Sequence, residues 1–329
     1  MEIVIAIDAM GGDFGPRCIV PASFDALKRF PALHLLLCGQ RDALSAWSPP
    51  ASLANRLQFD YVDALVGPDE RPAAVVRSRT RTSMHAALDA VRQGRAQGCL
   101  SAGNTGAWMA LARQLLGTLP DIDRPAMMSA LPGRGEHQTL LLDLGANLDS
   151  SAEQLVQFAY LGAGAAQARG LVRPRVALLN VGREPGKGTP VIQEAARRLA
   201  QSQAFDFIGF VEGSDLYAAV ADVVVCDGFT GNAVLKSGEA LLRLLVERSG
   251  TASWLERQLL QPWLARRFRH WDPELRNGAS FLGLNAVVVK SHGAAGEVGL
   301  VQAIERALRD VETDLPGRIR LNLAALKAV

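Results

Sequence analysis

Short apolar runs of strand length recur along the whole chain, and helical patterns lie between most of them. Alternating strands and helices are typical of a mostly parallel β-sheet with helices on both faces. No internal repeat or low-complexity linker divides the sequence, so we expect one α/β domain over residues 1–329. The strand-like runs are Ile3 to Ile7, Leu33 to Cys38, Leu57 to Val62, Cys99 to Ser101, Thr139 to Asp143, Val176 to Val181, Phe205 to Val211, Val223 to Cys226 and Ala286 to Lys290.

One of these runs leads directly into a polar turn and a helix. Residues 223–226 are apolar throughout, as in a strand buried on both faces, and Asp227 and Thr230 follow at its carboxyl end. A helix that begins near Asn232 would point its free N–H groups into the crevice where open α/β sheets bind ligands, which favours an anion. The alternative is that Asp227 or Thr230 only caps the helix.

The first predicted strand ends in a glycine-rich turn. Asp8 is followed by Gly11 and Gly12 before the next helix, an order that suits a loop around a phosphate group. The spacing matches neither the dinucleotide-binding motif nor the P-loop, so no nucleotide motif is met. A plain tight turn is the alternative.

A second turn of this kind has no charged residue. Ser101, Asn104 and Thr105 lie between a short strand and a helix, and they provide two hydroxyls and an amide for an anion. Three arginines just upstream could bind phosphate or could form a solvated basic turn. These arginines are Arg77, Arg79 and Arg81.

The next polar turn raises the question of a metal ion. Asp143 and Asn147 surround a glycine at the end of another strand, and Asp149 follows them. No histidine or third acid stands at ligand spacing, so we expect no metal ion there. These residues are better suited to hold neighbouring backbone and to orient a lysine.

Lysines lie at or after the ends of two further strands. Asn180 begins a loop that contains Glu184 and Lys187, and Lys290 ends the last predicted strand, two residues before His292. Glycine or small residues flank both lysines, although a lysine at a strand end could be only a surface charge. Because the carboxyl ends of parallel strands lie at one edge of a sheet, we expect all these turns to converge on one anion site.

Residues 254–271 depart from the globular pattern. Three of the chain's five tryptophans fall here, apolar residues recur four apart, and arginines take much of the remaining surface. This combination is typical of a helix at a membrane interface, but a hairpin packed on a twin subunit needs the same apolar face. We expect a protruding helical hairpin over residues 237–282. Its apolar contacts are Trp254, Leu255, Leu259, Leu260, Trp263, Leu264, Phe268 and Trp271.

Composition narrows the classes of function. With 329 residues, 49% hydrophobic content and 21% charged content, the chain has the profile of an ordinary globular protein. A formal net charge of +2 gives no global signature of nucleic-acid binding. The four cysteines form no CxxC pair, as expected of a reduced cytoplasmic protein. We find neither a secretory signal nor an apolar run that could span a membrane.

Six blocks, in order over nearly the full length, carry a resemblance to a known family: IDAMGGDFGP, SAGNTGA, LLDLGAN, NVGREPGKG, CDGFTGNAVLK and VVKSHG. Together they closely resemble the PlsX family of phosphate acyltransferases. One departure is that Arg183 and Pro185 stand where acidic residues are common in that family.

The resemblance implies transfer of a long-chain fatty acyl group from acyl carrier protein to inorganic phosphate, giving acyl phosphate for phospholipid synthesis without a cofactor. It also implies a fold similar to isocitrate and isopropylmalate dehydrogenases and to phosphotransacetylase. A homodimer is expected, located in the cytoplasm and associated peripherally with the anionic inner face of the cell membrane.

This chemistry agrees with the pattern of polar turns. Phosphate is already nucleophilic and a thiolate leaves readily, so the site needs positioning and oxyanion donors, not a strong base or a metal. We expect phosphate to bind Gly11, Gly12, Ser101, Asn104, Thr105 and Lys290. Lys187, Asn232 and His292 would stabilise the oxyanion or protonate the departing sulfur, with Asp227 orienting them. Asp8, Asp143, Asn147, Asn180, Glu184 and Thr230 would shape the site.

Four alternatives stay open. A short-chain acyltransferase that uses coenzyme A thioesters would not need the tryptophan-rich segment. A decarboxylating dehydrogenase of the same fold would need a cluster of metal-binding acids, which is not evident. A noncatalytic membrane scaffold would leave the polar strand ends unexplained. A covalent route would use Cys226 as the nucleophile, but no histidine neighbours it in the sequence.

Overall fold

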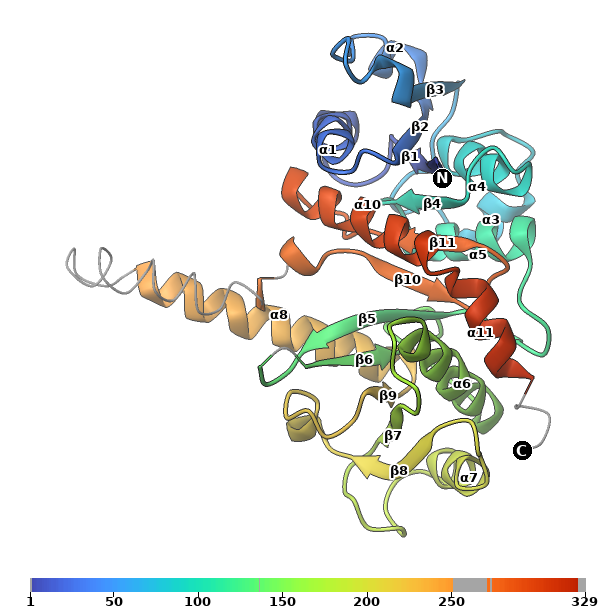
Figure 1. Cartoon of the computed structure of the whole chain (residues 1–329), viewed down its shortest axis with the longest axis vertical. Coiled ribbons are helices and arrows are strands. Elements are labelled where there is room, and N and C mark those ends of the chain that lie inside the picture. The colour runs from blue at the N-terminus through green and yellow to red at the C-terminus, as the bar shows by residue number, and fades with distance from the viewer. Residues whose placement is uncertain (1, 136, 251–270, 273, 325–329) are drawn as a thin grey trace.

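The computed structural model describes residues 2–135, 137–250, 271–272 and 274–324 (Figure 1). Within these ranges one sheet of 11 strands has the order β3-β2-β1-β4-β11-β10-β5-β6-β9-β7-β8. The strands are β1 (Ile3–Asp8), β2 (Leu33–Gln40), β3 (Leu57–Val62), β4 (Gly98–Ser101), β5 (Ala126–Pro132), β6 (Gln138–Leu142), β7 (Arg175–Leu179), β8 (Asp206–Val211), β9 (Val223–Val225), β10 (Ala279–Leu282) and β11 (Val287–Lys290). The helices are α1 (Pro16–Arg29), α2 (Arg41–Leu44), α3 (Pro72–Arg77), α4 (Ser83–Arg92), α5 (Thr105–Leu116), α6 (Ala152–Ala168), α7 (Pro190–Leu199), α8 (Gly228–Gly250), α10 (Glu297–Glu312) and α11 (Leu315–Leu323), with short 3-10 turns that include η2 (Gly213–Asp215) and η4 (Glu274–Arg276).

Strand direction changes in the middle of the sheet. β3, β2, β1, β4 and β11 form one parallel set, and β6, β9, β7 and β8 form a second. β10 and β5 lie between the sets, and each pairing from β11 to β6 is antiparallel. The second set therefore runs against the first. The mostly parallel α/β sheet is confirmed, but β5 and β10 are absent from the sequence-based prediction.

Helices cover both faces of this sheet. Alternate residues of β1 show the division, because Ile5 belongs to the core under α1 and α10, and Ala6 belongs to the core under α4 and α5. In the second half, α6, α7 and α11 pack on the face that carries α1 and α10 (Figure 1). The start of α8 packs on the opposite face through Val234 and Leu235.

α8 extends beyond the body of the molecule (Figure 1). Leu241 and Leu244 on this helix are exposed, at 60% and 56%. They lie within the segment predicted to protrude, residues 237–282, but residues 279–282 at its end form β10 in the central sheet. Within the described ranges, no helix is both long enough and apolar enough to cross a bilayer.

Most residues expected at a membrane or subunit contact lie outside the described residues. They are Trp254, Leu255, Leu259, Leu260, Trp263, Leu264 and Phe268. Trp271 is described, and its ring lies on Tyr217 with the ring centroids 5.4 Å apart. The role of this segment in binding a membrane or a second subunit stays a prediction.

Candidate active site

Three loops at the carboxyl ends of β1, β4 and β11 pack backbone against backbone. Gly12 has a φ of +82°, which favours glycine, and a side chain there would lie 2.9 Å from the carbonyl oxygen of Gly293. A Cβ at Gly11 would approach the backbone nitrogen of Gly103 to 2.6 Å. The Asp13 N–H donates to the Gly293 carbonyl at 2.9 Å. Gly11 and Gly12 therefore allow the loops to meet.

A buried carboxyl group joins two of these loops. Asp8 is 1% exposed and accepts a hydrogen bond of 2.7 Å from Ser101 Oγ, which in turn accepts the Gly103 N–H at 3.0 Å. Burial raises the pKa of Asp8, and its hydrogen bonds partly oppose that rise. Because the hydroxyl of Ser101 binds protein atoms on both sides, Ser101 supports the loop.

Lys290, the last residue of β11, is buried beside the same loops. It is 7% exposed, and its Nζ donates to the Ala102 carbonyl at 3.2 Å and also to the carbonyl of Ser291. Burial lowers the pKa of Lys290 to about 8, against the charges of Asp8 and Asp13, which raise it. An ammonium group has three donors, so one is left for an anion.

Asn104 and Thr105 begin α5. Asn104 Oδ1 accepts the Ala107 N–H at 3.0 Å, as an N-cap does, and its Nδ2 donates to the carbonyls of Pro68 and Glu70 at 2.9 and 3.0 Å. Both amide hydrogens are therefore used within the chain. A contact between this turn and phosphate would have to come from the first backbone N–H groups of α5, which have no partner within the helix.

A second group of polar residues follows β6. Asp143 is fully buried, and its carboxylate accepts the N–H groups of Met127, Ala146 and Asn147 at 2.8, 3.2 and 2.6 Å. Burial raises the pKa of Asp143, and these hydrogen bonds oppose the rise. The Gly228 N–H at the start of α8 donates to the Asn147 carbonyl at 2.8 Å. Asp143 and Asn147 thus hold neighbouring backbone in place.

The turn into α8 is closed by Asp227. Its carboxylate accepts the Thr230 N–H at 2.7 Å and the Thr230 hydroxyl at 3.0 Å, so both residues act in capping the helix. Position 231 has room only for glycine, because a Cβ there would lie 1.9 Å from the carbonyl oxygen of Asp143. Asn232 is exposed, and its side chain makes no hydrogen bond among the described residues.

Cys226 lies just before this turn. It is 5% exposed, its Sγ donates to the Asp143 carbonyl at 3.7 Å, and burial raises the pKa of the thiol well above its usual value. A buried neutral thiol is a poor nucleophile, so the structure gives the covalent route through Cys226 no support. In the parts of the chain described, no three His, Cys, Asp or Glu side chains form a group that could hold a metal ion.

Lys187 lies in the loop after β7. Asn180 anchors this loop, because its Nδ2 donates to the Lys187 carbonyl at 3.1 Å and its Oδ1 accepts the Val181 N–H at 2.9 Å. A Cβ at Gly182 would meet Glu184 Oε2 at 2.7 Å and Lys187 Cγ at 3.2 Å, so glycine leaves room for both side chains. Lys187 is exposed and has no ion pair within the described ranges.

Arg183 in the same loop pairs with the carboxylate of Asp215 in η2. That carboxylate also accepts the Glu212 N–H at 2.9 Å. The Glu212 N–H and the Arg183 guanidinium both lower the pKa of Asp215. The arginine that departs from the family pattern is therefore bound by an acid, which ties the Lys187 loop to η2.

One residue outside the sequence-based prediction joins the two groups. Lys236 on α8 places its Nζ 2.8 Å from His292 Nε2, in the loop after β11, and pairs with Glu239 at 2.8 Å. Asn232 precedes Lys236 by four residues, so the two side chains lie on one face of α8. This spacing within CDGFTGNAVLK is the signal that could have identified Lys236.

The hydrogen bonds of His292 position its proton. Nδ1 accepts the Ala294 N–H at 3.2 Å, so a neutral ring carries its proton on Nε2, the atom that faces Lys236. The backbone N–H of His292 donates to Asn277 Oδ1 at 2.9 Å, which fixes the loop. Two N–H donors that face one another repel, and an anionic oxygen that accepts from both relieves the repulsion.

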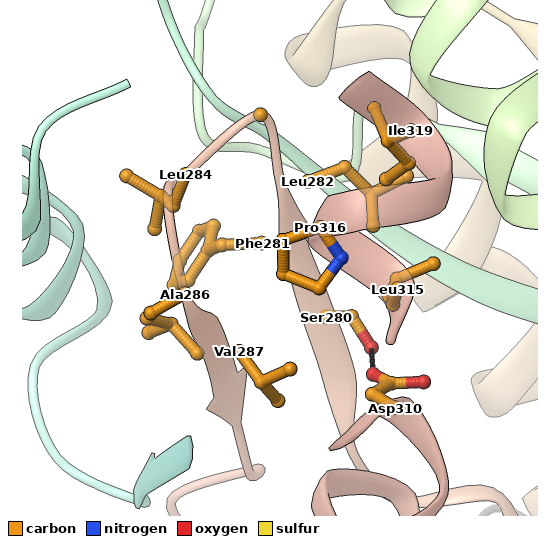
Figure 2. A pocket seen from close by; sticks show the side chains of 12 residues that line it. Ser280, Phe281, Leu282, Leu284, Ala286, Val287, Asp310, Leu315, Pro316 and Ile319 are labelled. Atoms are coloured by element: carbon orange, nitrogen blue, oxygen red, sulfur yellow. Dashed lines mark hydrogen bonds between the residues drawn. The ribbon is translucent and has the colours of Figure 1, made fainter. Parts of the chain in front are cut away.

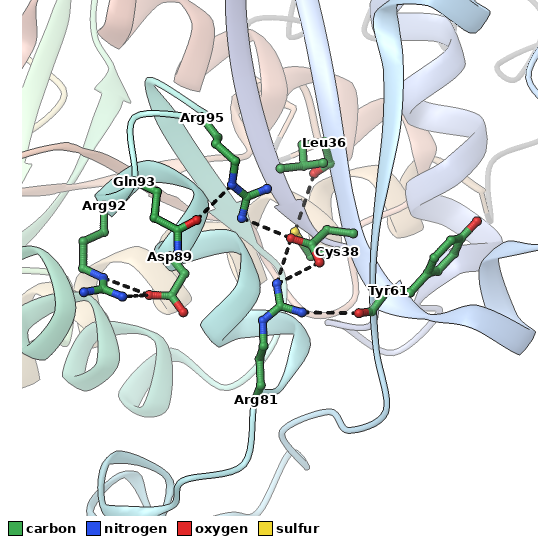
Figure 3. A network of polar contacts seen from close by, with 9 residues as sticks. Leu36, Cys38, Tyr61, Arg81, Asp89, Arg92, Gln93 and Arg95 are labelled. Carbon is green, nitrogen blue, oxygen red and sulfur yellow. Dashed lines mark hydrogen bonds and ion pairs between the residues drawn. The ribbon is translucent and has the colours of Figure 1, made fainter.

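Two of the three arginines singled out upstream of β4 have other partners. Arg81 pairs with Asp60 at 2.8 Å, and Arg95 contacts the same carboxylate at 3.2 Å (Figure 3). Arg77 donates to the carbonyl of Ala73 in its own helix at 3.0 Å. For Arg77 and Arg81 these contacts favour a structural role over phosphate binding.

A small apolar cavity lies between β10, β11 and α11 (Figure 2). Its walls include Phe281, Leu284 and Ile319, and its volume is about 10 Å³. That is room for about one water molecule. This cavity therefore cannot hold an acyl chain.

The two groups of polar turns come from parallel sets of opposite direction, so the expectation of one common sheet edge is corrected. Five steps in the strand order separate β4 from β9. A twist of about 20–25° per strand accumulates to roughly 100–125° over these steps and swings the two sets of carboxyl ends towards each other. The Lys236–His292 contact then connects them.

Solved structures with this architecture define a class of fold. A branched-chain phosphotransacylase from Enterococcus faecalis V583 has a TM-score of 0.63 at 16% identity, over 94% of this chain and 99% of that chain. A phosphotransacetylase from Streptococcus pyogenes has a TM-score of 0.60 at 18% identity, over 94% of each chain. An isocitrate dehydrogenase from Methylococcus capsulatus has a TM-score of 0.50 at 13% identity, over 97% of this chain and 88% of that chain. The chain has the fold of phosphotransacetylases and isocitrate dehydrogenases.

Sequence similarity identifies the family within this fold class. The family described as "Fatty acid synthesis protein" matches residues 3–318. The phosphate acyltransferase of Stutzerimonas stutzeri (strain A1501) is 53% identical over 325 residues, 96% of this chain and 91% of that protein. That of Ectopseudomonas mendocina (strain ymp) is 49% identical over 331 residues, 98% of each. The chain therefore belongs to this family, the PlsX phosphate acyltransferases, and is an enzyme of fatty acid and phospholipid synthesis.

Proposed function

We propose that this enzyme transfers a long-chain fatty acyl group from acyl carrier protein to inorganic phosphate, releasing acyl phosphate for phospholipid synthesis. The observation that supports the proposal most directly is the group formed by Lys236, Lys290 and His292. It brings N–H donors from α8 and β11 together beside the glycine loops. Several charged or polar donors that converge in this way suit a small oxyanion such as phosphate.

The reaction needs little from the protein beyond placement. A phosphate oxygen attacks the thioester carbon, the carbon–sulfur bond breaks, and the sulfur leaves as a thiolate that takes up a proton. Placing the two reactants can contribute up to roughly 7–11 kcal/mol. Each donor aimed at the oxyanion of the tetrahedral intermediate can contribute about 10²–10³ in rate.

Phosphate would lie against Lys290, the backbone around Gly11 and Gly12, and the N-terminus of α5 at Thr105. This placement uses the donor of Lys290 that no carbonyl occupies. Ser101 and Asn104, which the sequence suggested as ligands, would act through the loops that they hold.

The thioester would lie between α8 and the loop after β11. His292 Nε2 holds a proton that the departing sulfur can take, and Lys236 beside it would stabilise the oxyanion. Asn232 lies one turn earlier on the same helix face and would add a donor. Lys187 would reach the site from the loop after β7, which borders β9.

The proposal is tested with purified protein, long-chain acyl carrier protein and phosphate. Phosphate-dependent release of free thiol is the expected result, and release without phosphate would indicate a thioesterase. Lys187→Ala should lower the rate at least about tenfold without unfolding the protein. Equal use of short-chain coenzyme A thioesters would favour the short-chain alternative.

We also propose that the enzyme is a cytoplasmic homodimer that binds the anionic inner face of the membrane through residues 254–271. Each arginine near an anionic surface contributes about 1 kcal/mol, so binding should weaken with salt. Sedimentation with vesicles that contain anionic lipid, at low and high salt, tests this. Equal binding to neutral vesicles would contradict the electrostatic part.

A further inference from the structure

A second group of cations surrounds the end of β5 and the start of β10. Arg169 follows α6, Arg276 ends η4, and Arg306 lies on α10. The Arg276 guanidinium donates to the Ala130 carbonyl in β5. Arg306 Cβ lies 3.3 Å from the position that a Cβ of Gly278 would take. These arginines come from three separate elements on the face of the sheet that carries α6 and α10 (Figure 1).

A carboxyl group lies within this group of arginines. This carboxyl group, Asp310, is 6% exposed and accepts the hydroxyl of Ser280 at 2.5 Å (Figure 2). Burial raises the pKa of Asp310, and the charges of Arg306 and Arg169 oppose the rise, which places both guanidiniums near it. Neither Arg169 nor Arg306 has a side-chain hydrogen bond or ion pair among the described residues.

The positive charges of these arginines act against one another. Burial and the charge of Arg306 lower the pKa of Arg276 to about 10. Arg169 is exposed and Arg306 is half-buried, so a partner can reach both. Desolvation and the charge of Arg306 lower the pKa of Arg169 to about 9, which leaves it charged at neutral pH. An acidic partner would relieve the repulsion, and attraction to complementary charge accelerates its docking.

The group borders the candidate active site. Arg276 is followed by Asn277, whose Oδ1 accepts the His292 N–H at 2.9 Å and whose Nδ2 donates to Ser291 Oγ at 2.7 Å. A partner that docks on the arginines therefore lies beside the loop that presents His292. That is where a carrier must deliver its thioester.

We infer that Arg169 and Arg306 form the docking surface for the acidic face of the acyl carrier protein, and that Arg276 lies beside them in the same surface. The inference rests on the proposed function. Two other exposed arginines are less suited, because Arg92 is paired with Asp89 and Arg197 with Glu194. Arg169 and Arg306 have no ion pair among the described residues, and Asn277 beside Arg276 contacts the loop that presents His292.

The test compares two double charge reversals. Arg169→Glu/Arg306→Glu should raise the KM for the acyl carrier protein at least about tenfold and reduce its dependence on salt, because the attraction becomes repulsion. Its kcat and its KM for phosphate should stay within about twofold. Arg92→Glu/Arg197→Glu is the control, since it changes net charge equally on other surfaces. Thermal unfolding checks that both variants fold.

Fluorescence anisotropy with labelled holo carrier protein measures docking without turnover. We expect at least about tenfold weaker binding only for Arg169→Glu/Arg306→Glu. Wild-type affinity in that variant would overturn the inference, and so would a change from dimer to monomer with carrier binding intact, which would assign the arginines to a contact between copies. If the wild-type enzyme releases no thiol with phosphate, the proposed function fails, and the anisotropy result still decides the docking surface.

Discussion

Lys290 is a buried lysine whose ammonium contacts carbonyl oxygens, and its pKa is lowered to about 8. Anion binding needs the charged form, so the KM for phosphate should rise as the pH passes through about 8. Kinetics at about pH 6.5 to 9.5 measure this. Lys290→Met should bind phosphate weakly at every pH, without the rise. An unchanged pH profile in Lys290→Met would remove Lys290 from the phosphate site.

Protein stability should respond to the titration of Lys290 in the opposite direction: it rises with pH where phosphate binding weakens. Its folded pKa of about 8 lies below the value of 10.5 for a free lysine. The penalty for burying the charge therefore applies in full below about pH 8 and is relieved as the pH rises towards 10.5. The wild-type protein should gain stability over that window relative to Lys290→Met, as measured by urea unfolding.

Lys236 is the residue whose loss should affect the chemistry most directly. Its Nζ lies 2.8 Å from His292 Nε2, so Lys236→Ala removes one donor from the oxyanion and should lower kcat about 10²-fold. Lys236→Arg should restore part of the rate. Glu239→Gln keeps the contact with His292 and serves as control, with less than about tenfold loss. A normal kcat in Lys236→Ala would contradict the proposed placement of the thioester.

At the level of single residues, the sequence predicts the chemistry of the site better than it predicts the contacts between its side chains. Lys290 ends a strand and His292 follows it within one short block, so their type and position indicate an anion site. Asn104 caps α5 and binds a loop 34 and 36 residues away, which no local pattern reveals. Lys236 meets His292 across a separation of 56 residues, and for that reason it was missed.

The start of α5 depends on one amide side chain. Asn104→Ala removes the N-cap and the two bonds to Pro68 and Glu70, so the free energy of unfolding should fall by about 1–2 kcal/mol. Asn104→Ser keeps a cap and should lose less. Urea unfolding measures both. If Asn104 also binds phosphate through its side chain, both variants should raise the KM for phosphate equally, whereas a purely structural role predicts a larger effect for alanine.

Strands β5 and β10 are not predicted from the sequence, and the reason is physical. β5 contains Ser129 and ends at Pro132, and β10 has only 4 residues after a glycine, so neither is a clear apolar run. Both are antiparallel to their neighbours and are not part of a strand–helix–strand unit. The alternation of strands and helices therefore predicts the two parallel sets but not the reversal between them.

That reversal makes the active site a property of the whole molecule. Polar turns of the first set include Gly12 and Lys290, those of the second include Asp143 and Asp227, and Lys236 on α8 reaches from the second set to the first. Within the described residues, the contact between Lys236 Nζ and His292 Nε2 links α8 directly to the loop after β11.

Phosphate binding should therefore stabilise segments from both parallel sets of strands. Hydrogen–deuterium exchange with and without saturating phosphate should show slower exchange in residues 11–13, 102–106 and 291–293 and also in the first turns of α8, because ligand binding stabilises every segment that contributes to its site. In Lys236→Ala the first three segments should stay protected, whereas α8 should lose its response. Protection confined to the loops of β1, β4 and β11 in the wild-type protein would mean that phosphate binds one half alone. The thioester, not phosphate, would then have to draw α8 into the site.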